Sequence, residues 1–171
     1  MNSYPYYSLN AFNIYTVAGA NWMDMDKLFL SLDYRFWMSA SLVLICAAIV
    51  VLQWRSREKR PLFELAGFLI ISVFMLVPMM HERYILPACI LLVFAYAYSM
   101  DNITLFFGCA FSFTALVNEM VVLFGDSSAS SPLPTLIFSA VNIGLYIAYT
   151  ILTVKKMCSG KVLIKSPGLL G

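Results

Sequence analysis

The stretch FWMSASLVLICAAIVVLQW, residues 36–54, decides the fold class because it runs for 19 residues without a charged side chain. A helix needs about 20 mainly apolar residues to cross the hydrocarbon core of a bilayer. The full chain has 171 residues, of which 61% are hydrophobic and 12% are charged. Soluble domains carry about 25% charged residues. The composition therefore excludes a soluble globular domain and also a disordered chain.

Further apolar runs follow this first one. They are separated by short polar segments and cover residues 65–80, 84–100, 103–124 and 135–154. The run 65–80 reaches across a bilayer if residues 62–64 join its helix, and Pro78 is expected to distort its last turn. Asp101 and Asn102 predict a very tight connection between two spans. The pattern predicts an all-α, polytopic transmembrane bundle with about five spans.

Basic residues indicate how these spans are oriented. Residues 55–60 hold four Lys or Arg, and residues 155–165 hold four more. Only three basic residues lie at the other ends of the spans: Lys27, Arg35 and Arg83. Because cytoplasmic loops carry the excess of Lys and Arg, we expect the amino terminus outside the cell and the carboxy terminus in the cytosol. The predicted parts are an extracytoplasmic or interfacial segment 1–35, a five-helix transmembrane domain 36–156 and a cytoplasmic tail 157–171.

Several classes of function are excluded or disfavoured. A net charge of +2 is too small to indicate a nucleic-acid partner. The four cysteines show no C-x-x-C spacing and the chain has one histidine, so the sequence predicts no disulfide framework, no zinc site and no His-based metal cluster within the chain. A small transporter is disfavoured because no charged residue lies near the middle of a predicted span, where coupling and substrate sites lie.

The densest polar group is His81-Glu82-Arg83-Tyr84, between two predicted spans. An imidazole, a carboxylate and a guanidinium together can bind a phosphate or a sugar hydroxyl, and arginine holds phosphate in a fork. The alternative interpretation is a polar turn between two helices, with Arg83 reaching for lipid headgroups.

A second polar group combines amides with an aromatic ring: Asn10, Asn13, Asn21 and Trp22. Sugar rings are bound by such directional donors and flat apolar faces, although an interfacial aromatic belt with turn-forming asparagines explains the same residues. Glu119 is a third candidate, because a carboxylate within a span is costly and marks a functional site by default. It lies only about one turn from the end of its span, which favours an interface position. The remaining acids of the amino-terminal segment are interpreted as solvated loop acids: Asp24, Asp26 and Asp33.

Two segments resemble motifs of a known family. Residues 9–15 (LNAFNIY) followed by residues 19–22 (GANW) resemble the NAFN…GxNW segment of a family of polytopic mannosyltransferases. Residues 80–88 (MHERYILPA) resemble the MHERYxxPA segment of the same family. These bacterial and archaeal proteins are related to the enzyme that adds the second mannose to GPI anchors, and they belong to the GT-C superfamily. The resemblance covers the whole chain but only the carboxy-terminal part of the family.

The resemblance implies a membrane portion of a glycosyltransferase in a bacterial or archaeal plasma membrane. The family transfers mannose from a polyprenyl-phosphate donor to a glycan acceptor. His81 and Arg83 would lie near the donor phosphate and Glu82 would orient one of them. The amide group would line the same outer cavity. No cofactor is identified in the chain, although cations or a divalent metal would offset the charge of the leaving phosphate.

The family's catalytic base lies in an outer loop that has no counterpart in this sequence. The catalytic residue is therefore unknown, and we expect that the chain is a fragment or split product that is inactive alone. Its partners would be membrane lipids, the lipid-linked donor, the acceptor and a second chain that supplies the missing amino-terminal spans. The alternative is a non-catalytic integral membrane subunit or remnant that packs against a partner.

Overall fold

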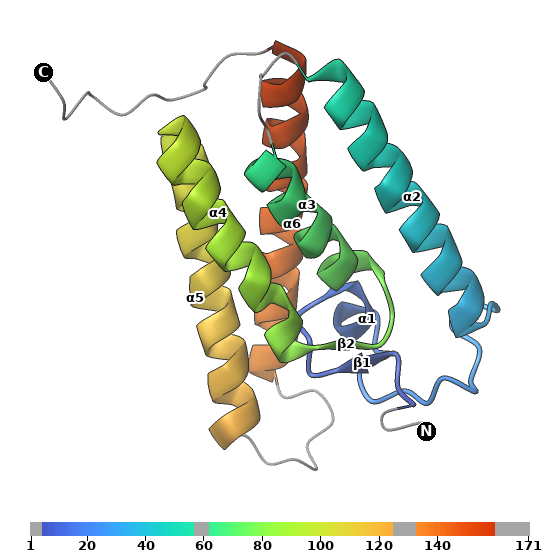
Figure 1. Ribbon diagram of the computed structural model, residues 1–171. Helices are drawn as coiled ribbons and strands as arrows, with labels where there is room; N and C mark the ends of the chain where they lie inside the picture. Colours follow the sequence, from blue (N-terminus) through green and yellow to red (C-terminus); the bar gives the residue numbers. More distant parts are fainter. Residues whose placement is uncertain (1–4, 57–61, 125–132, 160–171) are drawn as a thin grey trace, which may run out of the picture.

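The computed structural model describes residues 5–56, 62–124 and 133–159, and these are mainly helical (Figure 1). The longer helices are α2 (Tyr34–Arg55), α3 (Leu62–Leu76), α4 (Leu86–Ser99), α5 (Asn102–Phe124) and α6 (Leu133–Ser159). The shorter elements are β1 (Ser8–Leu9), α1 (Ile14–Val17), β2 (Met80–His81) and the 3-10 helix η1 (Glu82–Ile85).

The longer helices run alternately up and down, so their termini gather at two ends of one bundle (Figure 1). One end, which we call the strand end, holds the amino-terminal segment 5–33, β1, β2 and η1. The opposite end holds the last turns of α2 and α6, the first turn of α3 and the turn between α4 and α5. This alternation is the one that the sequence predicted for its spans.

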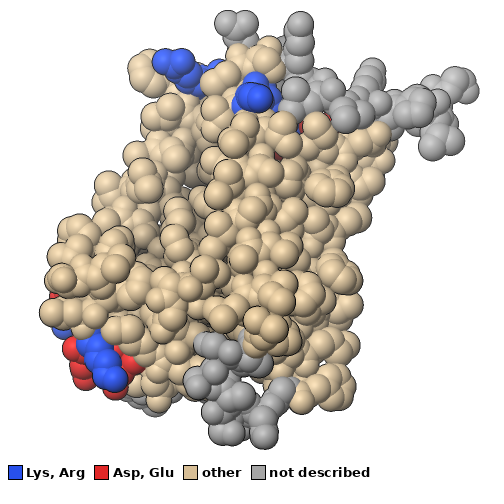
Figure 2. Space-filling model, turned by 180° about the vertical axis from the view of Figure 1, so that it is seen from behind, with Lys and Arg blue, Asp and Glu red and all other residues tan. Residues whose placement is uncertain are grey.

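Helix length supports three of the predicted spans. By length and composition, α2, α5 and α6 are able to cross a membrane. With 15 and 14 residues, α3 and α4 are shorter; at 1.5 Å per residue each reaches about 21–23 Å, less than the hydrocarbon core of about 30 Å. Figure 2 shows a broad surface without Lys, Arg, Asp or Glu between charged side chains at the two ends. The two further spans stay a prediction.

Two prolines mark helix boundaries: Pro78 follows the end of α3, and Pro87 lies in the first turn of α4. α3 ends at Leu76 because the residue that precedes Pro78 is driven out of the helical region, and Met79 then adopts a φ of 66°. Pro87 lies in the first turn of α4, where no intrahelical hydrogen bond is lost. The predicted tight connection is also present, since Met100 closes α4 with a φ of 52° and α5 begins at Asn102.

The break between α3 and α4 is filled by a small β pairing that the all-α prediction did not include. β1 runs parallel to β2, with Ser8 opposite Met80 and Leu9 opposite His81. The amide of Met79 donates to the carbonyl of Tyr7 at 2.8 Å. Non-helical backbone at membrane depth is tolerated only where protein or water satisfies its polar groups. The amino-terminal segment provides that partner.

The main apolar core lies among α3, α4, α5 and α6 and includes Ile71, Leu92, Phe111 and Tyr149. The helices approach closely around Leu92. A Cβ added at Gly67 of α3 would lie 3.0 Å from Leu92 Cδ2, and one added at Gly108 of α5 would lie 3.3 Å from Leu92 Cβ.

α6 extends further than the sequence indicated. It continues to Ser159, past residue 157, where the tail was predicted to begin. Lys156 and Met157 are buried, so this turn packs inside the bundle. The rest of the predicted tail, the basic residues 57–60 and the loop 125–132 lie outside the described residues.

Our first prediction concerns orientation. In a chain whose other native cysteines are alanine, a membrane-impermeant maleimide should label Asp26→Cys in intact cells. It should label the native Cys158, exposed near the end of α6, only after permeabilisation. The reason is that the two positions lie at opposite ends of the bundle and the basic excess marks the Cys158 end as cytosolic. The reverse labelling pattern would contradict the orientation.

Candidate functional site

The strand end brings together the two sequence segments that carry the candidate residues. Asn10 forms a backbone bridge with His81, directly after the pairing of Leu9 with His81. The amino-terminal segment therefore folds back onto the His81-Glu82-Arg83 motif. The two polar groups therefore share one end of the bundle.

Asn10 is the centre of a small amide network. Its Oδ1 accepts hydrogen bonds from Asn21 Nδ2 at 3.2 Å and from Trp22 Nε1 at 2.9 Å. Its backbone amide donates to Asn21 Oδ1 at 2.9 Å. Both Asn10 and Trp22 have positive φ, which asparagine tolerates and tryptophan does not favour. The network fixes the Trp22 ring, which is partly exposed and packs edge-on against Tyr6 at 5.3 Å.

Asn13 has a different environment from the other candidates. It is fully buried and its Oδ1 accepts from the amides of Tyr15 and Thr16, so it caps α1. Its Nδ2 donates to the carbonyl of Phe74 at 3.3 Å, and Tyr15 Oη donates to the carbonyl of Leu76 at 3.0 Å. Burial raises the pKa of Tyr15 to about 12, so the phenol remains a donor. These two side chains satisfy carbonyls that the end of α3 leaves unpaired.

Glu82 connects the charged residues of the second motif. Its carboxylate is buried, with Oε1 3.3 Å from Arg83 Nη2 and Oε2 3.9 Å from His81 Nδ1. The Arg83 side chain is 67% exposed, and the Tyr84 ring is also exposed and meets the His81 ring edge-on at 5.2 Å. A guanidinium held on one side by a carboxylate and open on the other can bind a phosphate oxygen pair.

Glu119 belongs to the strand-end half of α5, beside Asn118. Asn118 is buried, and neither its Oδ1 nor Glu119 Oε1 has a hydrogen-bond partner among the described residues. Ser139 and Asn142 on α6 each have a buried oxygen in the same condition. Buried polar atoms of this kind require an explanation. Contact of Glu119 with a substrate stays a prediction.

The other acids of the amino-terminal segment serve local backbone structure. Asp33 caps α2 by accepting from the amide of Phe36 at 2.8 Å. Asp24 Oδ1 accepts from the amide of Asp26 at 3.0 Å. These contacts agree with the interpretation of the three residues as loop acids.

A divalent metal finds too few ligands at the strand end. Within the described ranges, no group of three His, Cys, Asp or Glu side chains could hold a metal ion. His81 and Glu82 alone do not form such a site.

The resemblance to the mannosyltransferase family is carried by the motif residues alone. No protein-family model, curated protein or solved structure matches this chain.

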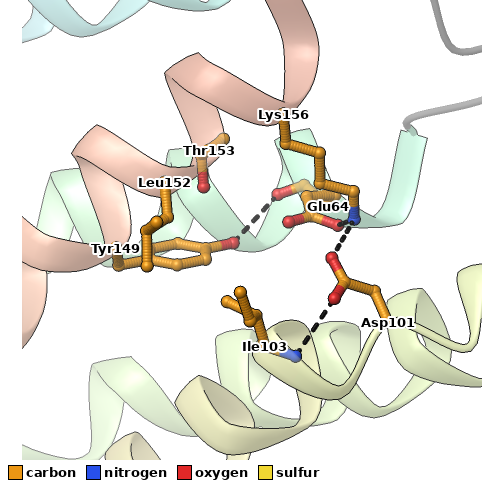
Figure 3. Close-up of a pocket in the computed structure, with 7 residues that line it drawn as sticks. All are labelled: Glu64, Asp101, Ile103, Tyr149, Leu152, Thr153 and Lys156. Atoms are coloured by element: carbon orange, nitrogen blue, oxygen red, sulfur yellow. Dashed lines mark hydrogen bonds and ion pairs between the residues drawn. The ribbon is translucent and has the colours of Figure 1, made fainter. Parts of the chain in front are cut away.

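A second polar cluster lies at the opposite end of the bundle and was not found from the sequence (Figure 3). Lys156 Nζ lies 2.5 Å from Glu64 Oε2 and 3.1 Å from Asp101 Oδ2. The same ammonium donates to Thr104 Oγ1 at 3.3 Å. All of these side chains are buried, and they come from α3, the α4–α5 turn, α5 and α6.

The helix termini support each of these charges. Glu64 lies in the first turn of α3, and Asp101 Oδ1 accepts from the amide of Ile103 at the start of α5. Lys156 lies in the last turn of α6. Carboxylates are stabilised at helix amino termini and cations at carboxy termini. The arrangement therefore joins three helix ends through complementary charges.

A small cavity of about 10 Å³ adjoins this cluster and is lined by Glu64, Asp101, Ile103, Tyr149, Leu152, Thr153 and Lys156. That is room for about one water molecule. The Thr153 hydroxyl points into the same region in Figure 3 and has no hydrogen-bond partner among the described residues. The charges of this cluster pair with one another inside the bundle, which favours a role as a structural joint between helix ends.

The sequence contains one signal for this cluster, namely the positions of its three charged residues along the predicted spans. Glu64, Asp101 and Lys156 all fall at span ends on the predicted cytosolic side. Opposite charges at the same depth on neighbouring helices can pair, but the sequence does not tell which helices are neighbours.

Our second prediction concerns this joint. Lys156→Met should lower the free energy of unfolding by about 3–5 kcal/mol, because it leaves buried carboxylates without their cation. The matched control is Lys155→Met, an exposed neighbour whose replacement should change stability by about 0.5 kcal/mol or less. Thermal or denaturant unfolding in one detergent measures both. Equal stability of the two variants would show that the cluster does not hold the bundle.

Proposed function

We propose that this chain is the membrane portion of a GT-C-type glycosyltransferase that uses a polyprenyl-phosphate sugar, such as polyprenyl-phosphate mannose. The observation that carries the proposal is the pairing of β1 with β2. It joins the two segments that resemble the family's motifs, although they lie far apart in the sequence. A shared position at one end of the bundle is what a common substrate cavity requires.

The chemistry of the second motif suits the phosphate of a lipid-linked donor. Arg83 offers an exposed guanidinium whose other side is held by the buried Glu82. His81 lies beside the same carboxylate and supplies a further polar group. In the proposed mechanism these residues bind and orient the donor phosphate and offset the charge that develops as the sugar leaves.

The aromatic and amide groups suit the sugar. Trp22 and Tyr84 present partly exposed rings at the strand end, and flat rings pack on the apolar faces of a pyranose. Asn10 and Asn21 hold the Trp22 ring in place. Asn13 acts by fixing the segment on α3. Glu119 lies on the same half of the bundle and is proposed to face the acceptor.

We further propose that the general base comes from a second chain that packs against this one. Asp24 and Asp33 are engaged in local backbone hydrogen bonds, and Glu82 is paired with Arg83. We also propose that the strand end lies outside a bacterial or archaeal plasma membrane and that α3 and α4 are two further spans of a five-span bundle.

A non-catalytic membrane subunit is the second candidate, and the surface of α2 favours it. In the apolar 18-residue stretch of α2, only 11% is buried within the described chain. Such a face can be covered by lipid or by a partner helix. This candidate predicts no specific affinity for a lipid phosphate.

Our third prediction separates these two functions by binding. The full chain in phosphatidylcholine nanodiscs should bind polyprenyl phosphate, and Arg83→Gln should weaken the affinity about 10-fold or more, the effect of losing a charge-assisted hydrogen bond. Arg55→Gln changes an exposed arginine at the opposite end and should leave the affinity within about 2-fold, since it loses no ligand contact. Equal affinity of both variants, with unfolding temperatures unchanged, would contradict a donor site at Arg83.

Our fourth prediction concerns transfer of the sugar. The purified chain mixed with polyprenyl-phosphate mannose and an acceptor should release no more polyprenyl phosphate than empty membranes. Loss of a general base lowers the rate about 10²- to 10⁴-fold. Clear turnover that Asp24→Asn or Asp33→Asn abolishes would show that one of these acids is the base.

A further inference from the structure

Residues 28–32 form a tight hairpin at the strand end, immediately before α2. Phe29 and Leu32 exchange both backbone hydrogen bonds, at 2.9 and 3.1 Å. The two residues between them, Leu30 and Ser31, have φ values of 49° and 66°. Two-residue hairpin turns with positive φ at both central positions strongly favour Asn-Gly. Leucine at the first central position is therefore an outlier that local backbone preference does not explain.

The tip of this hairpin is apolar and exposed. Leu28, Leu30 and Leu32 expose 63%, 71% and 38% of their surfaces. The base of the hairpin is firmly packed, because the Phe29 ring lies 5.7 Å from Tyr7 and 5.6 Å from Tyr15. Trp37 Nε1 also donates to the carbonyl of Phe29 at 2.9 Å. The leucines are thus presented outward from a fixed base.

The apolar tip leads into the exposed apolar surface of α2. The hairpin leads through the cap residue Asp33 into α2, a helix able to cross a membrane. Phe36 in the first turn of α2 is exposed as well. Lys27 precedes the hairpin and Arg35 follows it, and both are exposed. The acids Asp26 and Asp33 are exposed beside them, so the charges balance and do not by themselves require an anionic lipid.

We propose that hairpin 28–32 is a membrane anchor whose three leucines insert into the headgroup–acyl boundary of the leaflet at the strand end. Lys27 and Arg35 then lie at headgroup level, where long basic side chains reach lipid phosphates. Insertion removes three exposed leucines from water. It also keeps the amino-terminal segment, and with it the paired motif segments, against the membrane surface.

Depth-dependent quenching tests this anchor in the full chain. A single environment-sensitive fluorophore is attached to Leu30→Cys in a chain whose native cysteines are alanine, reconstituted in phosphatidylcholine nanodiscs. A nitroxide placed high on the acyl chain should quench the fluorophore at least about 3-fold more than it quenches the same fluorophore at Asp26→Cys. The control site is exposed and lies only four residues away.

Two outcomes would overturn the proposal. Equal quenching at both sites would place the tip in water. A blue-shifted fluorophore at Leu30→Cys that lipid nitroxides do not reach would show that protein, from a partner or a second copy, covers the tip.

A second variant guards against effects on folding. Leu30→Asn suits a positive φ and removes the apolar side chain. Its unfolding temperature in detergent should equal or exceed that of the native chain, while quenching of a fluorophore at Ser31→Cys should fall by at least about half. Unchanged quenching with Leu30→Asn would also overturn the proposal.

Discussion

The backbone break between α3 and α4 is the constraint on which the rest of the structure depends. Pro78 ends α3 inside an apolar run, which leaves carbonyls and non-helical amides without intrahelical partners. The amino-terminal segment satisfies them through the β1–β2 pairing and through Asn13 and Tyr15, which donate to the last carbonyls of α3. The position of the amino-terminal motif is therefore a consequence of where the helix stops.

The two ends of the bundle are held by different physical means. At the opposite end, Lys156 joins two buried carboxylates, so helix termini are fixed by charge. At the strand end, backbone pairing and amide hydrogen bonds hold the irregular amino-terminal segment in place. Backbone strain gathers there as well, since most non-glycine residues with positive φ in the described ranges lie at this end: Asn10, Trp22, Leu30, Ser31 and Met79. Strained residues cluster at functional sites, and this concentration agrees with the proposed site.

The sequence was informative about local structure and less so about long-range partners. Apolar runs predicted the long helices, and Pro78 predicted the distortion at the end of α3, because these effects act within a few residues. The resemblance also implied that Asn10 and His81 share one outer cavity. The buried Lys156 and its partners were missed, because pairing of helix ends depends on which helices are neighbours. The structural role of Asn13 was missed because its partner, the Phe74 carbonyl, carries no side-chain signal.

The central claim is that the two motif segments are joined by strand pairing, and cross-linking tests it most directly. Paired strands lie about 4.8 Å apart, within the Cα separation of about 4.4–6.8 Å that a disulfide bridges. In a chain whose native cysteines are alanine, Ser8→Cys and Met80→Cys should form a disulfide under mild oxidation. Ser8→Cys and Ser99→Cys, at opposite ends of the bundle, should not. Failure of the first pair, with both thiols reactive after unfolding, would contradict the pairing and the shared site.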